Sequence, residues 1–252
     1  MIILYVDENK MTFKVTILTL FPELFPGPLS VSITGKALEK GLWSYTPINI
    51  RDFATDNHKT VDDTPAGGGA GMVMKSDVLG RAVEHALELN GFGRIIYLSP
   101  RGKPLTQDRV KALSQEDHLI FLCGRYEGVD QRVLDEWNIE EISMGDYVLT
   151  GGEIPAYALI DACVRLQEGV LGDMESLNEE SFSNGLLEYP QYTRPQTWKN
   201  REIPEILISG HHEKIKRWRQ EQSETLTKTR RPDLWLTYLS KEEKYHEYST
   251  KI

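Results

Sequence analysis

Three turns in the sequence join a glycine-containing loop to the end of an apolar run, and together they could enclose one small molecule. They read YLSPRG at residues 97–102, LCGRYEG at residues 122–128 and MGDYVLTGGE at residues 144–153. In an open α/β sheet, ligands bind outside the carboxyl ends of the strands, where loops offer backbone N–H and C=O groups. Such groups suit the edge of an adenine ring, and glycines leave room for the ring to approach. The three turns together therefore predict a ligand site.

Two other motifs lack the spacing that their chemistry requires. PAGGGAGMVM at residues 65–74 is followed by no Gly-Lys-Ser/Thr and does not complete G-x-G-x-x-G after a strand, so we interpret it as a flexible or close-packed loop near a ligand. HHEK and HEYS miss H-E-x-x-H, because Lys216 and Thr250 stand where the second histidine should be. The histidines predicted to lie on the surface are His211, His212 and His246.

The two cysteines, Cys123 and Cys163, lie in apolar stretches without the spacing of metal ligands. We predict that both are buried reduced thiols, and we expect neither a disulfide nor a zinc site.

The elements that must position the three turns alternate between strand-like and helical stretches. KVTILTLF from Lys14, RIIYLSP from Arg94, HLIFLCG from His118 and EISMGDYVLTGGE from Glu141 predict strands. TQDRVKALSQ and VDQRVLDEW lie between the last three strands and have apolar residues at helical spacing. This alternation predicts an α/β domain with a mostly parallel sheet over residues 1–171.

A further helix is predicted directly after Gly152, over EIPAYALIDACVRLQEG. Thr150 and Glu153 have the spacing of a capping box, Pro155 falls in the first turn, and Gly169 follows the end. This helix would begin at the third turn, beside the predicted ligand site.

The C-terminal part of the chain has a different character. Residues 172–188, GDMESLNEESFSNGLLE, are polar and acidic with little periodicity, and we interpret them as a flexible interdomain linker. Residues 189–252 predict a small, mainly helical domain, in which Pro-punctuated extended chain precedes a basic helix, HHEKIKRWRQEQSETLTKTRRPDLW. That helix should stop at Arg231 and Pro232.

Composition and charge limit the classes of function. The chain has 252 residues, 40% of them apolar, which is typical of a soluble globular protein with a sizeable core. The apolar run in the opening MIILYVDENKM is too short to form the core of a signal peptide or to span a membrane. We therefore expect a cytoplasmic protein.

A net charge of −9 argues against nucleic-acid binding by the chain as a whole, because phosphate contacts need lysine and arginine. Residues 191–235 nevertheless carry 10 basic and 6 acidic side chains. This local excess indicates either a solvated helix face or a docking surface for a polyanion.

Seven stretches resemble, in order and spacing, the bacterial tRNA (guanine-N1)-methyltransferase family, TrmD, of the SPOUT superfamily. They are LFPELF, DDTPAGGGAGMVM, YLSPRG, LCGRYEGVDQR, SMGDYVLTGGEIPA, GLLEYPQYTRP and RRPDL, and the match runs from about residue 11 to residue 236. MTFKVTILTLFPE resembles the usual opening of the family, so residues 1–10 are interpreted as an extension or an alternative start.

The resemblance implies methyl transfer from S-adenosylmethionine to N1 of the guanosine immediately 3′ of the tRNA anticodon. It also implies a deep trefoil knot in the sheet domain, an obligate homodimer with active sites shared between subunits, and a dependence on magnesium, whose site no ligand spacing locates. Matching residues place the adenosine of the methyl donor among Tyr97, Leu98, Ser99, Pro100, Gly124, Met144, Gly145, Asp146, Tyr147, Val148, Leu149, Gly151 and Gly152.

The resemblance also implies two catalytic residues. Guanine N1 carries a proton at neutral pH, so the site needs a general base, and the family commonly has Asp before SF in the linker. Here NEESF puts Glu180 at that position with Glu179 adjacent, so the sequence departs from the family and leaves the choice between the two open; both could instead be solvated linker charges. Arg165 matches the arginine that stabilises the negative charge developing on O6. The alternative interpretation is that Arg165 is a charged side chain on the solvent-facing side of a helix.

Substrate contacts follow from the same resemblance. Arg125 and Glu127 stand where the family contacts the base or the donor, while Asp146 and Glu153 could aid recognition or cap a turn. In the basic segment, the side chains expected to grip tRNA phosphates include Lys214, Lys216, Arg217, Arg219, Lys228, Arg230 and Arg231, with Trp218 among them.

Two alternatives remain at this stage. One is a related knotted methyltransferase that acts on another RNA, and the other is a non-catalytic RNA-binding or nucleotide-sensing protein, which the glutamate at position 180 makes conceivable.

Overall fold

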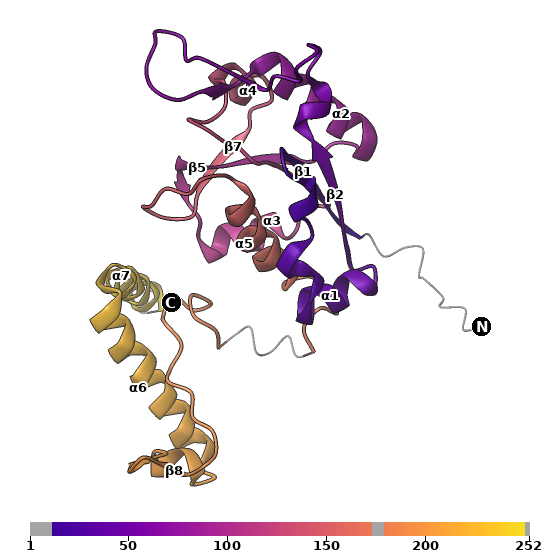
Figure 1. Cartoon of the computed structure of the whole chain (residues 1–252). Helices are drawn as coiled ribbons and strands as arrows, with labels where there is room; N and C mark the ends of the chain where they lie inside the picture. Colours follow the sequence, from indigo (N-terminus) through magenta and orange to yellow (C-terminus); the bar gives the residue numbers. More distant parts are fainter. Residues whose placement is uncertain (1–11, 173–178, 250–252) are drawn as a thin grey trace, which may run out of the picture. The chain divides into compact units, whose positions relative to one another are not determined.

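The computed structural model describes residues 12–172 and 179–249 (Figure 1). The chain divides into two compact units, Met1–Gly172 and Asp173–Ile252. The interpretation of residues 1–10 as an extension, and the part of the expected linker at residues 173–178, lie outside the described residues.

The first unit is built on a five-stranded sheet in the order β2-β1-β6-β5-β7. Every neighbouring pair of strands in this sheet is parallel, which confirms the predicted α/β class with a mostly parallel sheet. The strands are β1 (Phe13–Thr19), β2 (Trp43–Asn49), β5 (Arg94–Pro104), β6 (His118–Leu122) and β7 (Glu140–Ser143). The short antiparallel pair β3 (Asp62–Asp63) and β4 (Val73–Met74) brackets the glycine-rich loop.

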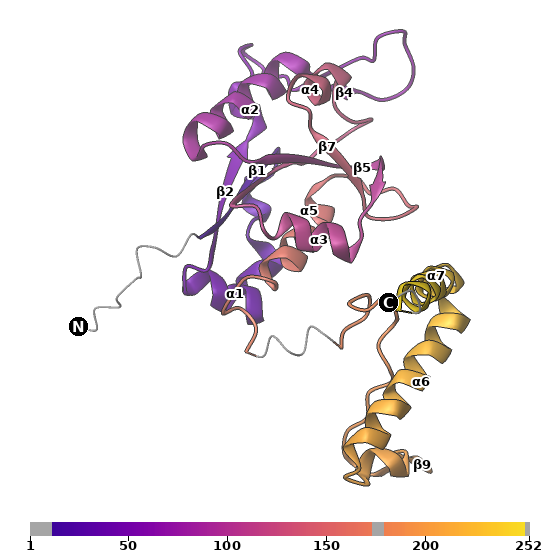
Figure 2. The ribbon, with the colours of Figure 1, turned by 180° about the vertical axis from the view of Figure 1, so that it is seen from behind.

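Helices cover both faces of the sheet, as Figures 1 and 2 show. One face carries α2 (Ser76–Asn90) and α4 (Gln131–Glu136), and the other carries α1 (Ser32–Glu39), α3 (Gln107–Leu113) and α5 (Glu153–Val164). The 3₁₀ turns of this unit include η1 (Pro22–Leu24), η2 (Gly27–Ser30) and η3 (Ile50–Phe53). Two hydrophobic clusters, one on each face, make the core.

Burial on both faces explains why the central strands have nearly continuous apolar runs. All five residues of β6, HLIFL, are buried. Strand β2 contains Pro47 and lies at an edge of the sheet, where a residue without an N–H costs no ladder bond.

An irregularity in β5 shapes the edge of the sheet. Leu98 and Lys103 both pair with Ile142 of β7, so residues 99–102 stand outside the regular ladder. A side chain at Gly102 would collide with the backbone at Ile142, so the return to the ladder requires glycine.

The structure corrects two predictions for residues 144–153. Strand β7 ends at Ser143, so Tyr147, Val148 and Leu149 belong to a loop and not to a strand. Their run of three apolar residues misled, because all three side chains are exposed, Val148 to 84%. The capping box is also wrong, because Gly152 is the N-cap of α5 and no side chain caps it.

The second unit contains η5 (Glu205–Ile208), α6 (His212–Arg230), α7 (Pro232–Ser249) and the short pair β8 (Thr197–Trp198) and β9 (Arg201–Glu202). Helix α6 ends just before Arg231 and Pro232, as expected, but the chain then resumes as a second helix with Pro232 at its first position, where a missing N–H costs nothing. Within the two described ranges, no helix is both long enough and apolar enough to cross a membrane.

Candidate functional site

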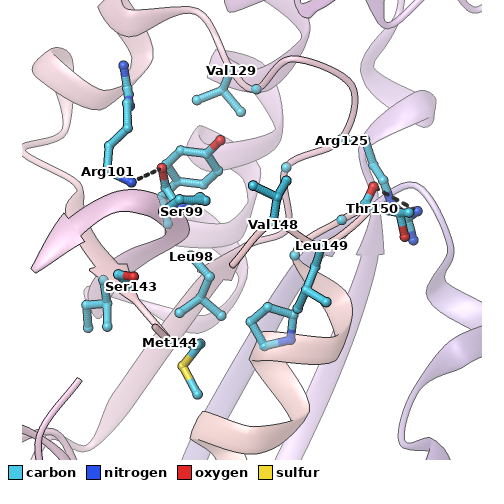
Figure 3. Close-up of a pocket in the computed structure, with 18 of the residues that line it drawn as sticks. Leu98, Ser99, Arg101, Arg125, Val129, Ser143, Met144, Val148, Leu149 and Thr150 are labelled. Carbon is cyan, nitrogen blue, oxygen red and sulfur yellow. Dashed lines mark hydrogen bonds between the residues drawn. The ribbon is translucent and has the colours of Figure 1, made fainter. Parts of the chain in front are cut away.

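A pocket of about 300 Å³ opens at the carboxyl ends of β5, β6 and β7 in the first unit (Figure 3). Its size is at the lower end of the range of small-molecule sites. Of the residues expected to bind the methyl donor, only Asp146 does not line it; those that do are Tyr97, Leu98, Ser99, Pro100, Gly124, Met144, Gly145, Tyr147, Val148, Leu149, Gly151 and Gly152. The three turns singled out in the sequence therefore meet at one place.

Apolar side chains from two of these turns surround the pocket. Figure 3 shows Leu98 from β5 together with Met144, Val148 and Leu149 from the loop after β7. The turn of β5 is held by the backbone N–H of Arg101, which donates to the hydroxyl of Ser99 at 3.2 Å. These walls suit a ligand with a flat apolar surface and a few polar edges.

The glycines let the three turns pack against one another. A Cβ on Gly124 would lie 2.6 Å from the ring of Tyr97, and a Cβ on Gly152 would lie 2.8 Å from Cα of Cys123. The N–H of Gly152 donates to the carbonyl of Gly124 at 3.0 Å. Gly152 thus makes room for neighbouring backbone and Gly151 for the side chain of Arg125. The pocket lies between the segments that they bring together.

A buried ion pair fixes the loop after β6 to the start of α5. Nη2 of Arg125 lies 2.8 Å from Oε2 of Glu153, whose side chain is only 1% exposed. The hydroxyl of Thr19 donates to Oε1 of the same carboxylate at 2.7 Å. The guanidinium of Arg125 also lies over the ring of Phe21, with its Cζ 4.6 Å from the ring centroid.

Arg125, expected to contact substrate, lines the pocket and is also paired with Glu153. Glu153 turns inward instead of capping α5. Removal of either partner would leave a poorly compensated charge, so the pair ties the loop to the sheet.

The glycine-rich loop contacts the pocket through Glu127. The N–H of Glu127 donates to the carbonyl of Met72 at 2.9 Å. Gly71 has a φ of +83°, and a Cβ there would collide with the side chain of Glu127. Glu127 is exposed and lines the pocket, so the loop lies beside the site, as its composition predicted.

Sequence reasoning missed Arg101, which lines the pocket from the same turn as Ser99 and Pro100. Its Nη2 donates to Glu141 at 3.0 Å and to Gln131 at 3.2 Å. Burial raises the pKa of the Tyr97 hydroxyl, and the charge of Arg101 opposes that rise. Its position directly after Pro100 in YLSPRG is the signal that could have identified it. The other lining residues outside the expected set are Tyr126, Gly128, Val129, Ile142, Ser143, Thr150 and Pro155.

The residues expected to act in catalysis lie in different units. Arg165 is the C-cap of α5 in the first unit, where it is half-buried. Glu180 is half-buried in the second unit, close to the start of its described part. The residues expected to bind tRNA, Lys214, Arg217 and Arg230, are all exposed on α6.

The remaining predictions concern cysteines and metals. Cys123 and Cys163 are free and buried, as predicted. In the described part of the chain, no group of three or more His, Cys, Asp or Glu side chains could hold a metal ion, so no residue is assigned to magnesium.

The fold and the pocket define an α/β protein with a small-molecule site at the carboxyl edge of a parallel sheet. Residues 13–237 match the family described as tRNA (Guanine-1)-methyltransferase TrmD. The chain therefore belongs to this family.

Similar proteins cover nearly the full length of the chain. A tRNA (guanine-N(1)-)-methyltransferase of Rhodospirillum rubrum is 59% identical over 230 residues, which are 91% of this chain and 95% of that protein. One from a Ruegeria species is 57% identical over 233 residues, 92% of this chain and 96% of that protein.

Proposed function

We propose that this protein transfers a methyl group from S-adenosylmethionine to N1 of a tRNA guanosine, the one immediately 3′ of the anticodon. The observation that carries the proposal is the meeting of the three family turns in one pocket of a chain that matches the family over residues 13–237. Relatives that share the chain's length carry the name tRNA (guanine-N(1)-)-methyltransferase, which supports the reaction and the class of substrate.

The chemistry of the pocket supports this choice of methyl donor. Its apolar walls, at Leu98, Val148 and Leu149, suit an adenine face, and the tight approach of Gly124 and Gly152 brings backbone polar groups to the edge of the ring. When bound, S-adenosylmethionine supplies an electrophilic methyl group. The family's deep knot would hold the three segments round this ligand, and the close contact between Gly152 and Cys123 supports such packing.

Glu180 and Arg165 have different catalytic roles toward the guanine. Glu180 accepts the N1 proton, which makes N1 nucleophilic, and Arg165 stabilises the negative charge that develops on O6. The carboxylate of glutamate is one methylene further from the backbone than that of the family's usual aspartate. The backbone at Glu180 must therefore lie correspondingly further from the guanine.

The two units share the RNA. Exposed basic residues of α6, including Lys214, Arg217 and Arg230, contact phosphates, while the acidic first unit receives the flipped guanine. This division explains how a chain with a net charge of −9 binds a polyanion.

We further propose that the enzyme is a homodimer in which the two subunits complete each site. Exposed apolar side chains gather on neighbouring elements of the first unit: Phe21 and Leu24 near η1, Val31 and Ile33 at the start of α1, and Ile154 at the start of α5. Ile154 and Val31 are each 62% exposed, and contiguous apolar surface suits a face that a second subunit covers.

The proposal is tested with labelled S-adenosylmethionine and an unmodified tRNA transcript that carries either guanosine or adenosine immediately 3′ of the anticodon. We expect transfer to the guanosine transcript alone, and a loss of about 10²-fold or more in Glu180→Gln, which keeps the shape of the side chain but cannot take the proton. Sedimentation at the assay concentration should show a dimer.

Each other outcome contradicts part of the proposal. Transfer to neither transcript would indicate another RNA or a non-catalytic binding protein. Full activity of Glu180→Gln would exclude this residue as the base, and an active monomer would exclude the shared site.

A further inference from the structure

The carboxylate of Glu179, next to the proposed base, is held by two other side chains. The hydroxyl of Tyr189 donates to Oε2 of Glu179 at 2.6 Å, and Nη1 of Arg219 donates to the same oxygen at 3.2 Å. The guanidinium of Arg219 also lies over the ring of Tyr189, with its Cζ 4.8 Å from the ring centroid. We call these three residues the Glu179 clasp.

The backbone that follows the clasp is also attached to helix α6. The N–H of Leu187 donates to the hydroxyl of Thr227 on α6 at 2.8 Å, and the N–H of Glu188 donates to the hydroxyl of Ser181 at 2.9 Å. Leu186 is only 1% exposed. This stretch, assigned to the linker from its composition, is folded against the helix in the structure.

The clasp fixes the side chain of Glu179. Oε2 already accepts from two donors, so only Oε1 is left to approach a substrate proton. Burial, and then the hydrogen bond to Glu179, raise the pKa of the Tyr189 hydroxyl, so it remains a donor at neutral pH.

We propose that Glu179 is a positioning residue. Its clasp with Tyr189 and Arg219 attaches the segment that carries Glu180 to helix α6 and so holds Glu180 in place. The inference rests on the proposed function, because it takes Glu180 as the base and α6 as the tRNA-binding helix. Its consequence is that the helix that docks the RNA also sets the position of the catalytic carboxylate. A misplacement of about 1 Å can cost about 10²-fold in rate, so such a link affects catalysis more than folding.

The clasp is exposed to solvent, so its loss should affect the catalytic rate more than the stability of the fold. The side chains of Arg219 and Glu179 are 40% and 59% exposed, and an ion pair so open to solvent contributes little to stability. Loss of the clasp should therefore leave the protein folded.

The test compares kcat and KM for tRNA in Glu179→Ala and Glu179→Gln, at saturating S-adenosylmethionine. Glutamine keeps an oxygen that accepts from Tyr189 and Arg219 but cannot remove a proton. We expect Glu179→Ala to lower kcat about tenfold with KM within about twofold, and Glu179→Gln to keep at least about a third of the wild-type kcat. Tyr189→Phe should lower kcat in the same direction as Glu179→Ala.

Glu224→Ala is the matched control, because Glu224 is a carboxylate on α6 that accepts from Gln220 of the same helix at 2.7 Å. It should leave kcat unchanged. Amide hydrogen exchange of residues 181–188 should accelerate in Glu179→Ala and not in Glu224→Ala.

The outcomes distinguish a positioning role of Glu179 from a role as the general base. If Glu179→Gln is as inactive as Glu180→Gln, Glu179 itself takes the proton and the clasp proposal fails. If Glu179→Ala accelerates exchange but retains full kcat, the clasp is only structural and the proposal fails as well. An inactive wild type would instead contradict the proposed function.

Discussion

At the scale of single residues, the pocket depends on glycines whose neighbours are backbone atoms. A Cβ on Gly152 would lie 2.8 Å from Cα of Cys123 and 3.0 Å from the nitrogen of Gly124. No change of rotamer relieves a collision with backbone. A Cβ on Gly172, in contrast, would meet no atom within 4 Å, so this glycine serves as the control.

We predict that Gly152→Ala lowers the free energy of unfolding by about 1–3 kcal/mol, the cost typical of overpacking. It should also weaken the binding of S-adenosylmethionine, because the loop after β7 and the turn after β6 must move apart. Gly172→Ala should change the free energy of unfolding by less than about 0.5 kcal/mol. Urea unfolding and titration calorimetry measure the two effects, and equal stabilities of the two variants would contradict the explanation.

At the scale of elements, α6 shows how two threonines two positions apart take different roles. Thr227 is fully buried; its hydroxyl donates to the carbonyl of Ser223 at 2.6 Å and accepts from the N–H of Leu187. Thr225 is exposed and its hydroxyl donates to the carbonyl of Glu221 at 2.8 Å. Of these two threonines, only Thr227 bonds to the segment that carries Glu180.

Thr227→Val should therefore destabilise the second unit by about 1–3 kcal/mol, because the N–H of Leu187 loses its acceptor. Thr225→Val, the control on the same helix, should stay within about 0.5 kcal/mol. The free energy of unfolding in urea and the exchange rate of the Leu187 amide are the measurements. The assignment would be wrong if that amide exchanged at the same rate in both variants.

At the scale of the whole molecule, two buried thiols make the free energy of unfolding decrease at alkaline pH. Burial raises the pKa of the Cys163 thiol from its ordinary value of 9.0 to about 12. Burial, with the charge of Glu153 second, also raises the pKa of Cys123 well above that value. The native state therefore holds protons that the unfolded chain releases above pH 9, so stability is full below pH 9 and falls as the pH rises toward 12.

Cys163→Ala should flatten this fall. Between about pH 8 and pH 10, wild type should lose about 1 kcal/mol more of its free energy of unfolding than Cys163→Ala, since each pH unit between the two pKa values corresponds to about 1.4 kcal/mol. Urea unfolding at the two pH values provides the comparison, with Glu136→Ala, an exposed carboxylate on α4, as a variant that should keep the wild-type slope. Parallel slopes for wild type and Cys163→Ala would show that this thiol does not titrate as proposed.

The parallel α/β sheet, the burial of the cysteines and the three glycine-containing turns could all be predicted from the amino-acid sequence. These follow from local signals: an apolar run such as HLIFL is buried wherever it pairs, and glycine-containing turns end such runs. Neither β2 nor α2 was predicted. Strand β2 mixes apolar with polar residues, whereas the buried residues of α2 fall at helical spacing, a signal that could have identified it.

Contacts between residues far apart in the chain could not be predicted from the sequence, because they depend on how the backbone folds. Val148 stands in an exposed loop and lines the pocket, although it lies in a run of three apolar residues that predicts a strand. Arg125 pairs with Glu153, and Glu179 with Arg219, across 28 and 40 positions of the chain. Periodicity records how each residue is buried, but the partner of a charge is set by the path of the backbone through space.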